Sequence, residues 1–210
     1  MKYTTRAEKL TYLQTLMDLE TGRLDEGAFQ WENELCEKGV KEKVLRGKIL
    51  RCGRCPGMNI PRFTEAVPGW GNLNAEVMFV GQSLHQPGVV TGLPFIGGSG
   101  YLIDAALRCS GLLRKDVFLW NVVLCHPPNN RASKQEEKDN CFEYLQEAVD
   151  IVRPRLLILL GNDAKQAPLT IPQGTTWRCY THPASFMYAE PESRANWVVK
   201  VSLEMDKVIE

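Results

Sequence analysis

Four short segments of the chain carry the apolar pattern of β-strands. Residues 77–80, 117–124 and 155–161 are dominated by consecutive apolar side chains, and residues 177–180 form a shorter, mixed run. Apolar runs of this length between turn residues predict buried strands. The run at 155–161 is apolar on both faces, which is typical of a central strand in a parallel sheet.

Segments with helical periodicity separate these strands. Residues 100–113, 136–152 and 194–208 place apolar side chains at helical spacing. Strands that alternate with helices predict a parallel sheet with helices packed on both faces. We therefore expect an α/β protein with three α/β/α layers around a short, mainly parallel, four-stranded central sheet.

The first 47 residues have a different character from the rest of the chain. Over residues 5–46, leucines recur at roughly helical spacing between charged residues, with a break predicted at 25–27. We therefore divide the chain into an N-terminal helical extension, residues 1–47, and an α/β domain, residues 48–210. Packing of the extension against the domain is the preferred interpretation, and binding of a partner is the alternative.

The composition narrows the class of protein. The 210 residues, 44% hydrophobic and 24% charged, have the make-up of a globular chain. No apolar run reaches the ~18–20 residues that a membrane span needs, and the N-terminus lacks the apolar core of a secretory signal. We therefore expect a cytoplasmic protein. The 25 basic and 25 acidic residues balance, which argues against wholesale coating of a polyanion but allows a local basic groove.

Ligands of open parallel sheets bind beyond the carboxyl ends of the strands, so the loops after the predicted strands are the first places to search. The segment Gly92–Gly100 is rich in glycine and precedes a helix, which favours close approach of the backbone to an anion. Its spacing matches neither a P-loop nor a dinucleotide fingerprint. Phe95, within this segment, has core packing as its first interpretation and stacking on a flat ligand as its second.

Two further strand ends carry polar candidates. Asn121 interrupts an apolar run, and a buried amide must find hydrogen-bond partners. In the simpler interpretation the Asn121 amide caps a loop. In the more specific interpretation it hydrogen-bonds the edge of a ligand. His182, followed by proline, is held in extended backbone at a strand end, and a structural and a catalytic role have about equal weight. The following residues, 186–188, suit an apolar wedge that enters a base stack.

The seven cysteines form an odd number in a chain without signs of export, which favours reduced thiols or thiolate–metal bonds over disulfides. Cys52 and Cys55 form a CxxC motif on a loop, a common geometry for two thiolates on one metal centre. Together with Cys125 and Cys141 they provide four thiolates for a [4Fe–4S] cluster or, as the less favoured alternative, a zinc ion. The spacing does not separate the two. The simpler interpretation is that Cys125 and Cys141 are buried in the core as small hydrophobic residues.

Ordered motifs of the chain resemble those of the iron–sulfur (family 4) members of the uracil-DNA glycosylase superfamily. The resemblance runs from about Cys52 to Tyr188 and is specific to the superfamily, because many motifs match in order. The four cysteines point to the cluster-bearing members. In chain order the matching segments are Cys52–Cys55, Val67–Gly71, Gly92–Gly100, Asn121–Arg131, Cys141, Leu160–Ala164 and His182–Ala184.

The resemblance implies roles for the matching residues. Phe95 would stack on a flipped base, Asn121 would hydrogen-bond its edge, and His182 would stabilise negative charge on the departing base. Base contacts are also expected from Gln82, Ser83 and Gly88. The predicted DNA contacts are Gly98, Ser99, Asn130, Arg131, Ser185, Phe186 and Met187. Cys52, Cys55, Cys125 and Cys141 would ligate a structural [4Fe–4S] cluster.

One motif departs from the family pattern. Two glutamates of the family's first motif correspond to Gln82 and Gly88, and no carboxylate occurs in residues 77–103. Three interpretations stay open. In the first, activity persists because stabilisation of the departing nucleobase matters more than a strong general base for the water. In the second, His85 takes over the positioning of water, with Gln82 beside it. In the third, the space freed at Gly88 accepts a larger nucleobase.

The expected function is therefore a monofunctional DNA glycosylase that flips out a damaged or modified base and hydrolyses its N-glycosidic bond, leaving an abasic site. Uracil or a larger modified pyrimidine, including a hypermodified base of phage DNA, is the expected target. The alternative is a catalytically impaired, glycosylase-like DNA-binding module with a structural cluster. A zinc-stabilised or redox-sensing protein is the third hypothesis. DNA is the expected partner of a monomer that needs no other protein and no membrane.

Overall fold

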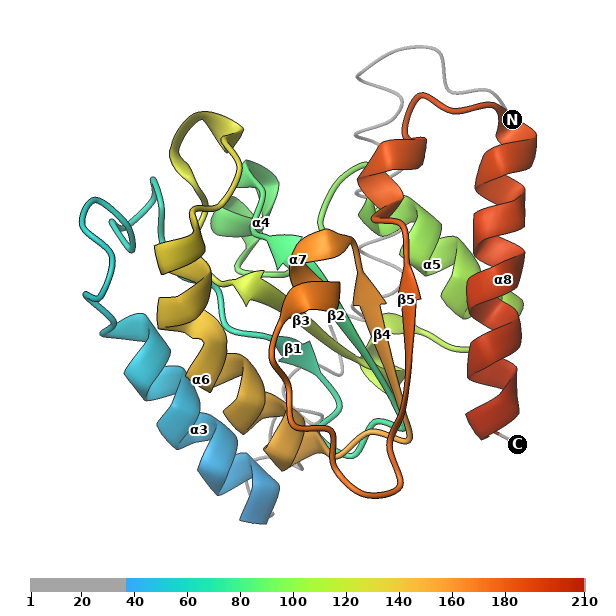
Figure 1. Cartoon of the computed structure of the whole chain (residues 1–210), viewed down its shortest axis with the longest axis horizontal. Coiled ribbons are helices and arrows are strands. Elements are labelled where there is room, and N and C mark those ends of the chain that lie inside the picture. The colour runs from blue at the N-terminus through green and yellow to red at the C-terminus, as the bar shows by residue number, and fades with distance from the viewer. Residues whose placement is uncertain (1–36, 210) are drawn as a thin grey trace.

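The computed structural model describes residues 37–209 and contains one central sheet of five strands (Figure 1). The strand order is β1-β3-β2-β4-β5, and every neighbouring pair is parallel except β1 and β3. The predicted α/β class and mainly parallel sheet are confirmed. The strands are β1 (Trp70–Gly71), β2 (Val77–Ser83), β3 (Phe118–Val123), β4 (Leu156–Leu160) and β5 (Thr176–Tyr180).

The predicted count of four strands is one short, because β1 has only two residues and lies in a segment rich in glycine and proline. Gly71 has φ 129°, and a Cβ built there would lie 2.0 Å from the Val117 carbonyl oxygen. Only glycine fits so close to the neighbouring strand. A two-residue strand of this kind has no periodic pattern from which it could be predicted.

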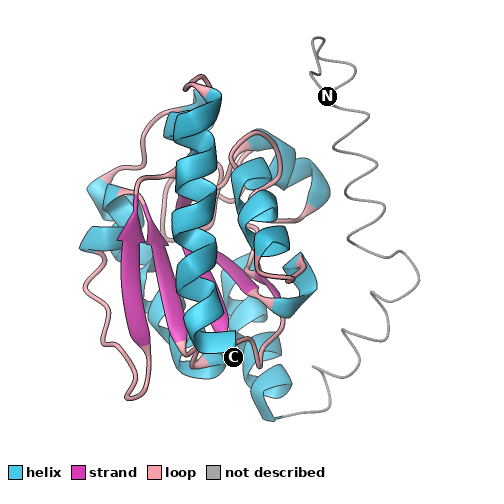
Figure 2. Ribbon diagram, turned by 90° about the vertical axis from the view of Figure 1, so that its right-hand side faces the viewer, coloured by secondary structure: helices cyan, strands magenta, loops and turns pink. Residues whose placement is uncertain are grey.

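Helices cover both faces of the sheet, as predicted. Figure 1 shows α3 and α6 on one side of the strands and α5 and α8 on the other, and Figure 2 shows α8 running along the sheet in front of the strands. The helices are α3 (Glu37–Leu50), α4 (Gln86–Thr91), α5 (Gly100–Cys109), α6 (Gln135–Val152), α7 (Asn162–Gln166) and α8 (Pro191–Ile209); single 3₁₀ turns cover Arg114–Asp116, Pro128–Asn130 and Pro183–Phe186.

The strands divide the core into two halves. In β2, Met78 and Val80 belong to the cluster that includes α3 and α6, whereas Val77 and Phe79 belong to the cluster that includes α5 and α8. All four side chains are at most 1% exposed. Alternate residues of a strand point to opposite faces, so a strand covered on both sides is apolar throughout. This is the physical basis of the continuous apolar runs in the sequence.

Helix α3 is the described part of the predicted N-terminal extension, and it packs onto the domain. Leu45 and Ile49 are each 1% exposed within the core half that contains α6. Lys38 Nζ donates to the carbonyl oxygens of Leu73 and Val152 at 3.0 and 2.9 Å. The helix ends at Leu50, three residues after the expected boundary at 47. The rest of the extension, residues 1–36, lies outside the described residues, and the division into two parts stays a prediction.

The strand order places a switch point above β2. This strand pairs with β3 on one side and with β4 on the other. The chain therefore leaves β2 in one direction for β3 and later returns to the opposite side for β4. Such a reversal opens a crevice at the carboxyl ends of the strands, where ligands of this fold class bind. Within residues 37–209, no helix combines the length and apolarity needed to cross a membrane.

Candidate active site

A small cavity at the carboxyl ends of β2, β3 and β5 gathers most of the predicted catalytic residues. It is lined by Ser83, Leu84, His85, Gly88, Phe95, Ile96, Ser99, Asn121 and His182. Phe95, Asn121 and His182 come from three separate loops or strand ends, as expected of residues beyond parallel strands. Gln82, also predicted, is not among the lining residues. Leu84 and Ile96 line the cavity and were missed, because a single apolar residue in a loop carries no periodic pattern.

Gly81 allows two of these side chains to meet. A Cβ built on Gly81 would lie 2.6 Å from Asn121 Oδ1 and 2.6 Å from the Phe95 ring. Gly81 pairs directly with Asn121 in the parallel register of β2 and β3. The glycine that ends the first apolar run therefore permits the amide and the aromatic ring to approach the same point from different elements.

The backbone of Phe95 is held in an unusual conformation. Its φ is 57°, in the left-handed region that non-glycine residues adopt at a cost of roughly 1–3 kcal/mol. Arg114 donates to the carbonyl oxygens of Pro94 and Phe95 at 3.2 and 2.9 Å. A buried ion pair with Asp104, at 2.6 Å, fixes the guanidinium in turn. Neither charged residue was predicted to support the site.

The hydrogen bonding of His182 defines its tautomer. The backbone N–H of Ala184 donates to His182 Nδ1 at 3.2 Å, so this nitrogen must be unprotonated. In the neutral imidazole the proton is therefore on Nε2. Burial lowers the pKa of His182 below its ordinary value, which favours this neutral form at pH 7. His182 thus offers the cavity an N–H donor without a full positive charge.

A second histidine, His126, lies behind the predicted His85. His126 is 7% exposed, and its Nδ1 lies 3.1 Å from the Leu84 carbonyl oxygen. The His85 and His126 rings are 6.3 Å apart at an interplanar angle of 59°. Burial, followed by the charge of His126, lowers the pKa of His85. The sequence analysis did not predict His126. The available signal was a polar residue directly after the predicted metal ligand Cys125.

The cavity is smaller than the sequence suggests. Its volume is about 20 Å³, close to the room that one water molecule needs. A Cβ on Gly88 would lie 2.7 Å from a methyl group of Leu84 and 2.9 Å from the Leu93 carbonyl oxygen. The space predicted to be free at Gly88 is therefore filled by Leu84. A nucleobase is larger than this cavity, so its entry requires lining residues to move.

The predicted wedge loop divides into an inward and an outward part. Phe186 packs on Trp197, with ring centroids 6.4 Å apart. Tyr188 is 97% exposed and Met187 41% exposed. Met187 also lies over Gly98, where a Cβ would be 2.3 Å from its terminal methyl group. Of the three side chains proposed from sequence to enter the base stack, Met187 and Tyr188 are available, whereas Phe186 anchors the loop.

Among the predicted DNA contacts, Arg131 is already engaged within the protein. Its guanidinium donates to both carboxylate oxygens of Glu137, at 2.9 and 2.5 Å. Glu137 is 5% exposed and also accepts from the Lys134 backbone N–H, which caps α6. Asn130, one residue earlier, has an exposed side chain and φ 54°. Arg131 therefore fixes the start of α6, and Asn130 remains free of this network.

The four cysteines predicted to bind a metal come together on the other side of β3 from Phe95. Cys125 and Cys141 are buried in the core half that contains α6, and Cys52 and Cys55 pack against it. Burial raises the pKa of Cys125 to about 12 and of Cys141 to about 11, and each of these two thiols interacts electrostatically with Cys52 and Cys55. All six cysteines within residues 37–209 are free, so no disulfide competes with metal binding there.

Polar side chains anchor the CxxC loop of this four-cysteine site. Asn59 Nδ2 donates to the Cys52 carbonyl oxygen at 2.8 Å, and Asn140 Nδ2 donates to Cys55 Sγ at 3.4 Å. Arg54 pairs with Glu143 and lies over the Tyr144 ring, 4.8 Å from its centroid. Four soft thiol donors with a cation nearby suit a thiolate–metal centre. In the side-chain positions described for residues 37–209, however, no group of three or more metal-binding side chains is arranged to hold an ion.

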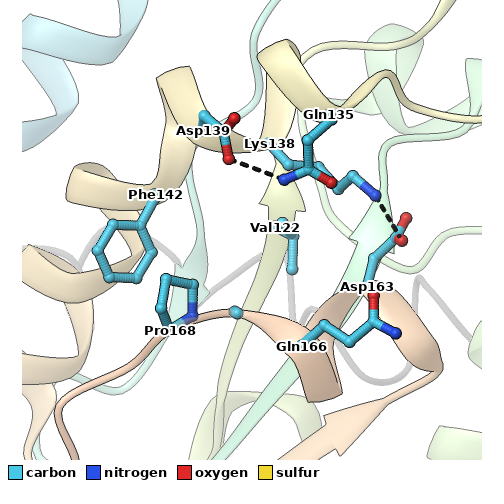
Figure 3. Close-up of a pocket in the computed structure, with 9 residues that line it drawn as sticks. Val122, Gln135, Lys138, Asp139, Phe142, Asp163, Gln166 and Pro168 are labelled. Carbon is cyan, nitrogen blue, oxygen red and sulfur yellow. Dashed lines mark hydrogen bonds and ion pairs between the residues drawn. The ribbon is translucent and has the colours of Figure 1, made fainter.

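A second cavity of about 160 Å³ lies between α6 and α7 (Figure 3). Phe142 and Pro168 form its apolar wall, and Lys138 pairs with Asp163 at 3.0 Å across it. Gln135 donates to Asp139 at 2.8 Å. Because these charged groups are already paired with each other or with an amide, the cavity presents no free charge to a ligand.

Comparison with known families identifies the class of this fold and site. Residues 68–204 match the family model described as the uracil DNA glycosylase superfamily. The match covers more than half of the chain and includes all five strands of the sheet, so the chain belongs to this superfamily.

Within the superfamily, the chain is similar to type-4 enzymes. It is 37% identical over 122 residues to the type-4 uracil-DNA glycosylase of Thermotoga maritima, covering 58% of this chain and 62% of that protein. It is 41% identical over 117 residues to that of Pyrobaculum aerophilum, covering 56% and 59%. The chain thus spans about three fifths of the length of these curated relatives. A crystal structure of UNG from Nitratifractor salsuginis aligns with 95% of this chain and 98% of that chain, at 14% identity and TM-score 0.40.

Proposed function

We propose that this protein is a DNA glycosylase that hydrolyses the N-glycosidic bond of a flipped base, with uracil as its target. The observation that carries the proposal is the convergence of Phe95, Asn121 and His182 on one cavity at the strand ends. A planar aromatic ring, an amide and a neutral N–H donor are the groups needed to stack on a base, read its edge and stabilise it as it departs. The type-4 relatives support the same activity.

The chemistry follows from these three side chains. Phe95 stacks on the extruded base, and Asn121 hydrogen-bonds its polar edge. As the bond between C1′ and the base nitrogen breaks, the electron pair moves onto the base, and His182 Nε2–H donates to the oxygen on which charge develops. Water then supplies a hydroxyl group to C1′ and a proton to the base. The sugar passes through a cationic state. Stabilisation of the departing base therefore lowers the activation barrier more than activation of the water does.

His85 is the proposed contact for the attacking water, because none of the described residues that line the cavity is Asp or Glu. The lowered pKa keeps His85 neutral at pH 7, so that a ring nitrogen can accept a hydrogen bond. Lysine is equally missing from the described lining, and we therefore propose a monofunctional enzyme that leaves an abasic site. Gln82, next to the cavity on β2, keeps its predicted supporting role in this proposal.

The position of Leu84 at Gly88, rather than the volume of the cavity, favours uracil over a larger modified pyrimidine. Leu84 fills the space at Gly88, so a hypermodified base, such as those of phage DNA, would require a further displacement of this side chain. Met187 and Tyr188 are the proposed residues that enter the gap left by the flipped nucleotide. Gly98, Ser99, Asn130 and Ser185 are the proposed contacts to the surrounding DNA.

Cys52, Cys55, Cys125 and Cys141 are proposed to hold a [4Fe–4S] cluster, with zinc as the alternative. When bound, such a group would supply a rigid covalent anchor for the loop and no step of the hydrolysis. Anaerobic purification followed by iron, sulfide and zinc analysis tests this part. Zinc without sulfide would contradict the cluster. The protein is further proposed to act on DNA as a monomer.

The decisive experiment is a base-release assay read by mass spectrometry. Single- and double-stranded oligonucleotides would carry uracil, hypoxanthine, xanthine, thymine or a hydroxymethylated or glucosylated pyrimidine. We expect free uracil and an intact abasic strand, released roughly several hundredfold more slowly by the His182→Ala protein. Release of a larger base alone would contradict the proposed target. Binding of uracil-containing DNA without release of any base would instead support the second candidate, a glycosylase-like DNA-binding module, which the lack of a carboxylate in the described lining favours.

A further inference from the structure

All three histidines of the chain lie at or directly behind the catalytic pocket. His85 and His182 line the pocket and have proposed roles there. His126 does not line it, is 7% exposed, and belongs to none of the roles assigned above. A buried imidazole is retained in a core only with a hydrogen-bond partner, so its contacts indicate what it does.

The hydrogen bond of His126 has only one possible direction. Its Nδ1 lies 3.1 Å from the carbonyl oxygen of Leu84, and a carbonyl oxygen only accepts. His126 Nδ1 therefore carries a hydrogen and donates it. Leu84 and His85 follow the end of β2 and form one wall of the pocket, so the bond ties this wall to the segment after β3.

His126 is linked to the four-cysteine site through the chain. Cys125 is its neighbour in the chain, interacts electrostatically with the other three thiols, and is bridged to Ala66 of the loop that follows the CxxC motif. A single peptide unit thus separates a proposed ligand of the cluster from the imidazole that holds the pocket wall.

We propose that His126 is a positioning residue that holds the Leu84–His85 wall over the pocket and connects it to the four-cysteine site. Through the Leu84 carbonyl it keeps the Leu84 side chain against Gly88 and the His85 ring at the pocket edge. This inference rests on the proposed glycosylase activity for its kinetic consequences, but the hydrogen bond itself does not depend on that activity.

Two amide variants test the polarity of the contact. In His126→Asn, the side-chain amide nitrogen stands near the place of Nδ1 and can donate to Leu84, whereas in His126→Gln it stands nearer Nε2. We expect His126→Gln to lower kcat for uracil release on the order of 100-fold, because small displacements of catalytic groups have effects of this size. The KM for DNA should change little, and His126→Asn should recover most of kcat. Equal rates for the two variants would overturn the proposal.

A double-mutant cycle tests whether His126 acts through His85. If it does, adding His126→Gln to His85→Ala should cost little beyond His85→Ala alone, because the positioned group is already missing. The control cycle with His182→Ala should show additive losses, since His182 is held by Ala184. Additive losses in the His85 cycle would contradict the assigned route. Iron content should equal that of the wild type in both amide variants, and its loss would place the role of His126 at the cluster instead.

Hydrogen exchange separates this inference from the proposed function. In free protein, His126→Gln should raise amide exchange in residues 84–92 more than His126→Asn does, without raising it in residues 52–58. If wild-type protein releases no base from any substrate, the proposed function fails and this measurement still decides the role of His126. Unchanged exchange in residues 84–92 of His126→Gln would overturn the inference even in an active enzyme.

Discussion

The proposed catalytic pocket and the four-cysteine site are assembled in different ways. In the pocket, the Arg114 side chain holds the Phe95 carbonyl, the Ala184 N–H holds His182, and Gly81 leaves no room for a methyl group. In the four-cysteine site, the CxxC turn has open space and is fixed by polar side chains such as Asn59. Side chains anchor both regions, and the difference between them is steric: the pocket is closely packed around Gly81, whereas the cysteine loop has free space at Gly53.

The largest expected effect on the pocket is that of His182→Ala. Removal of a donor aimed at developing charge costs about 3–4 kcal/mol of transition-state stabilisation, a rate loss of several hundredfold. DNA affinity should change far less, because the contact strengthens only as the bond breaks. Single-turnover base release and equilibrium DNA binding measure the two quantities. Equal losses in both would show that His182 is structural.

Two glycine substitutions compare the regions most directly. Gly81→Ala forces a methyl group to 2.6 Å from both Asn121 Oδ1 and the Phe95 ring, and should lower stability by about 1–3 kcal/mol and abolish most base release. Gly53→Ala, inside the CxxC turn, meets nothing within 4 Å and should change neither stability nor activity. Denaturant unfolding and base release check both variants. Tolerance of Gly81→Ala would remove the argument that close packing around Gly81 defines the pocket.

Two cysteine substitutions, one inside and one outside the four-cysteine site, test the proposed metal ligands. Cys52→Ser should lower iron content and melting temperature, because it removes a proposed ligand from the loop. Cys109→Ser is the matched control, since Cys109 is exposed at the end of α5 and belongs to a different element. Metal analysis and thermal unfolding of the anaerobically purified proteins provide the readout. Unchanged iron in Cys52→Ser would exclude this residue from the ligand set.

The wedge loop allows stability and DNA contact to be separated. Phe186→Ala removes packing on Trp197 and should cost about 1–3 kcal/mol of unfolding free energy, below the value for a fully buried phenylalanine. Tyr188→Ala, at a side chain 97% exposed, should leave stability unchanged and slow base release from double-stranded DNA more than from single-stranded DNA. The reverse assignment of effects would contradict the division of the loop into anchor and wedge.

The smallest effect concerns pH. The folded-state pKa values of His85 and His182 lie below their ordinary values because of burial. The unfolded chain therefore binds protons first as the pH falls below about 6.5, and stability decreases in that direction. Base release should fall at lower pH, around the lowered folded-state pKa of His85, because protonated His85 cannot accept a hydrogen bond from water. A pH profile of kcat in the His85→Gln protein, which lacks this titrating group, should lose part of the acidic decline.

The apolar patterns were sufficient to predict the α/β class, the four parallel strands and the positions of α5, α6 and α8. They failed for β1, α4 and α7, because elements of two to six residues are too short to show a period. The motif residues Phe95, Asn121 and His182 were placed correctly at strand ends, and the structure brings them to one cavity. Arg114, which bonds to the Phe95 carbonyl, and His126, which bonds to the Leu84 carbonyl, are partners distant in sequence that no apolar periodicity indicates.

The sequence by itself determined which strands are buried on both faces, where the loops at their carboxyl ends lie, and which side chains those loops carry, because these properties depend on local periodicity and residue chemistry. Only the tertiary structure decided that Leu84 fills the space at Gly88, that Arg131 is paired with Glu137, that Phe186 packs on Trp197 and that His126 bonds to the Leu84 carbonyl. Each of these depends on contacts between residues far apart in the chain or on the direction a side chain takes, and both follow from how the layers pack.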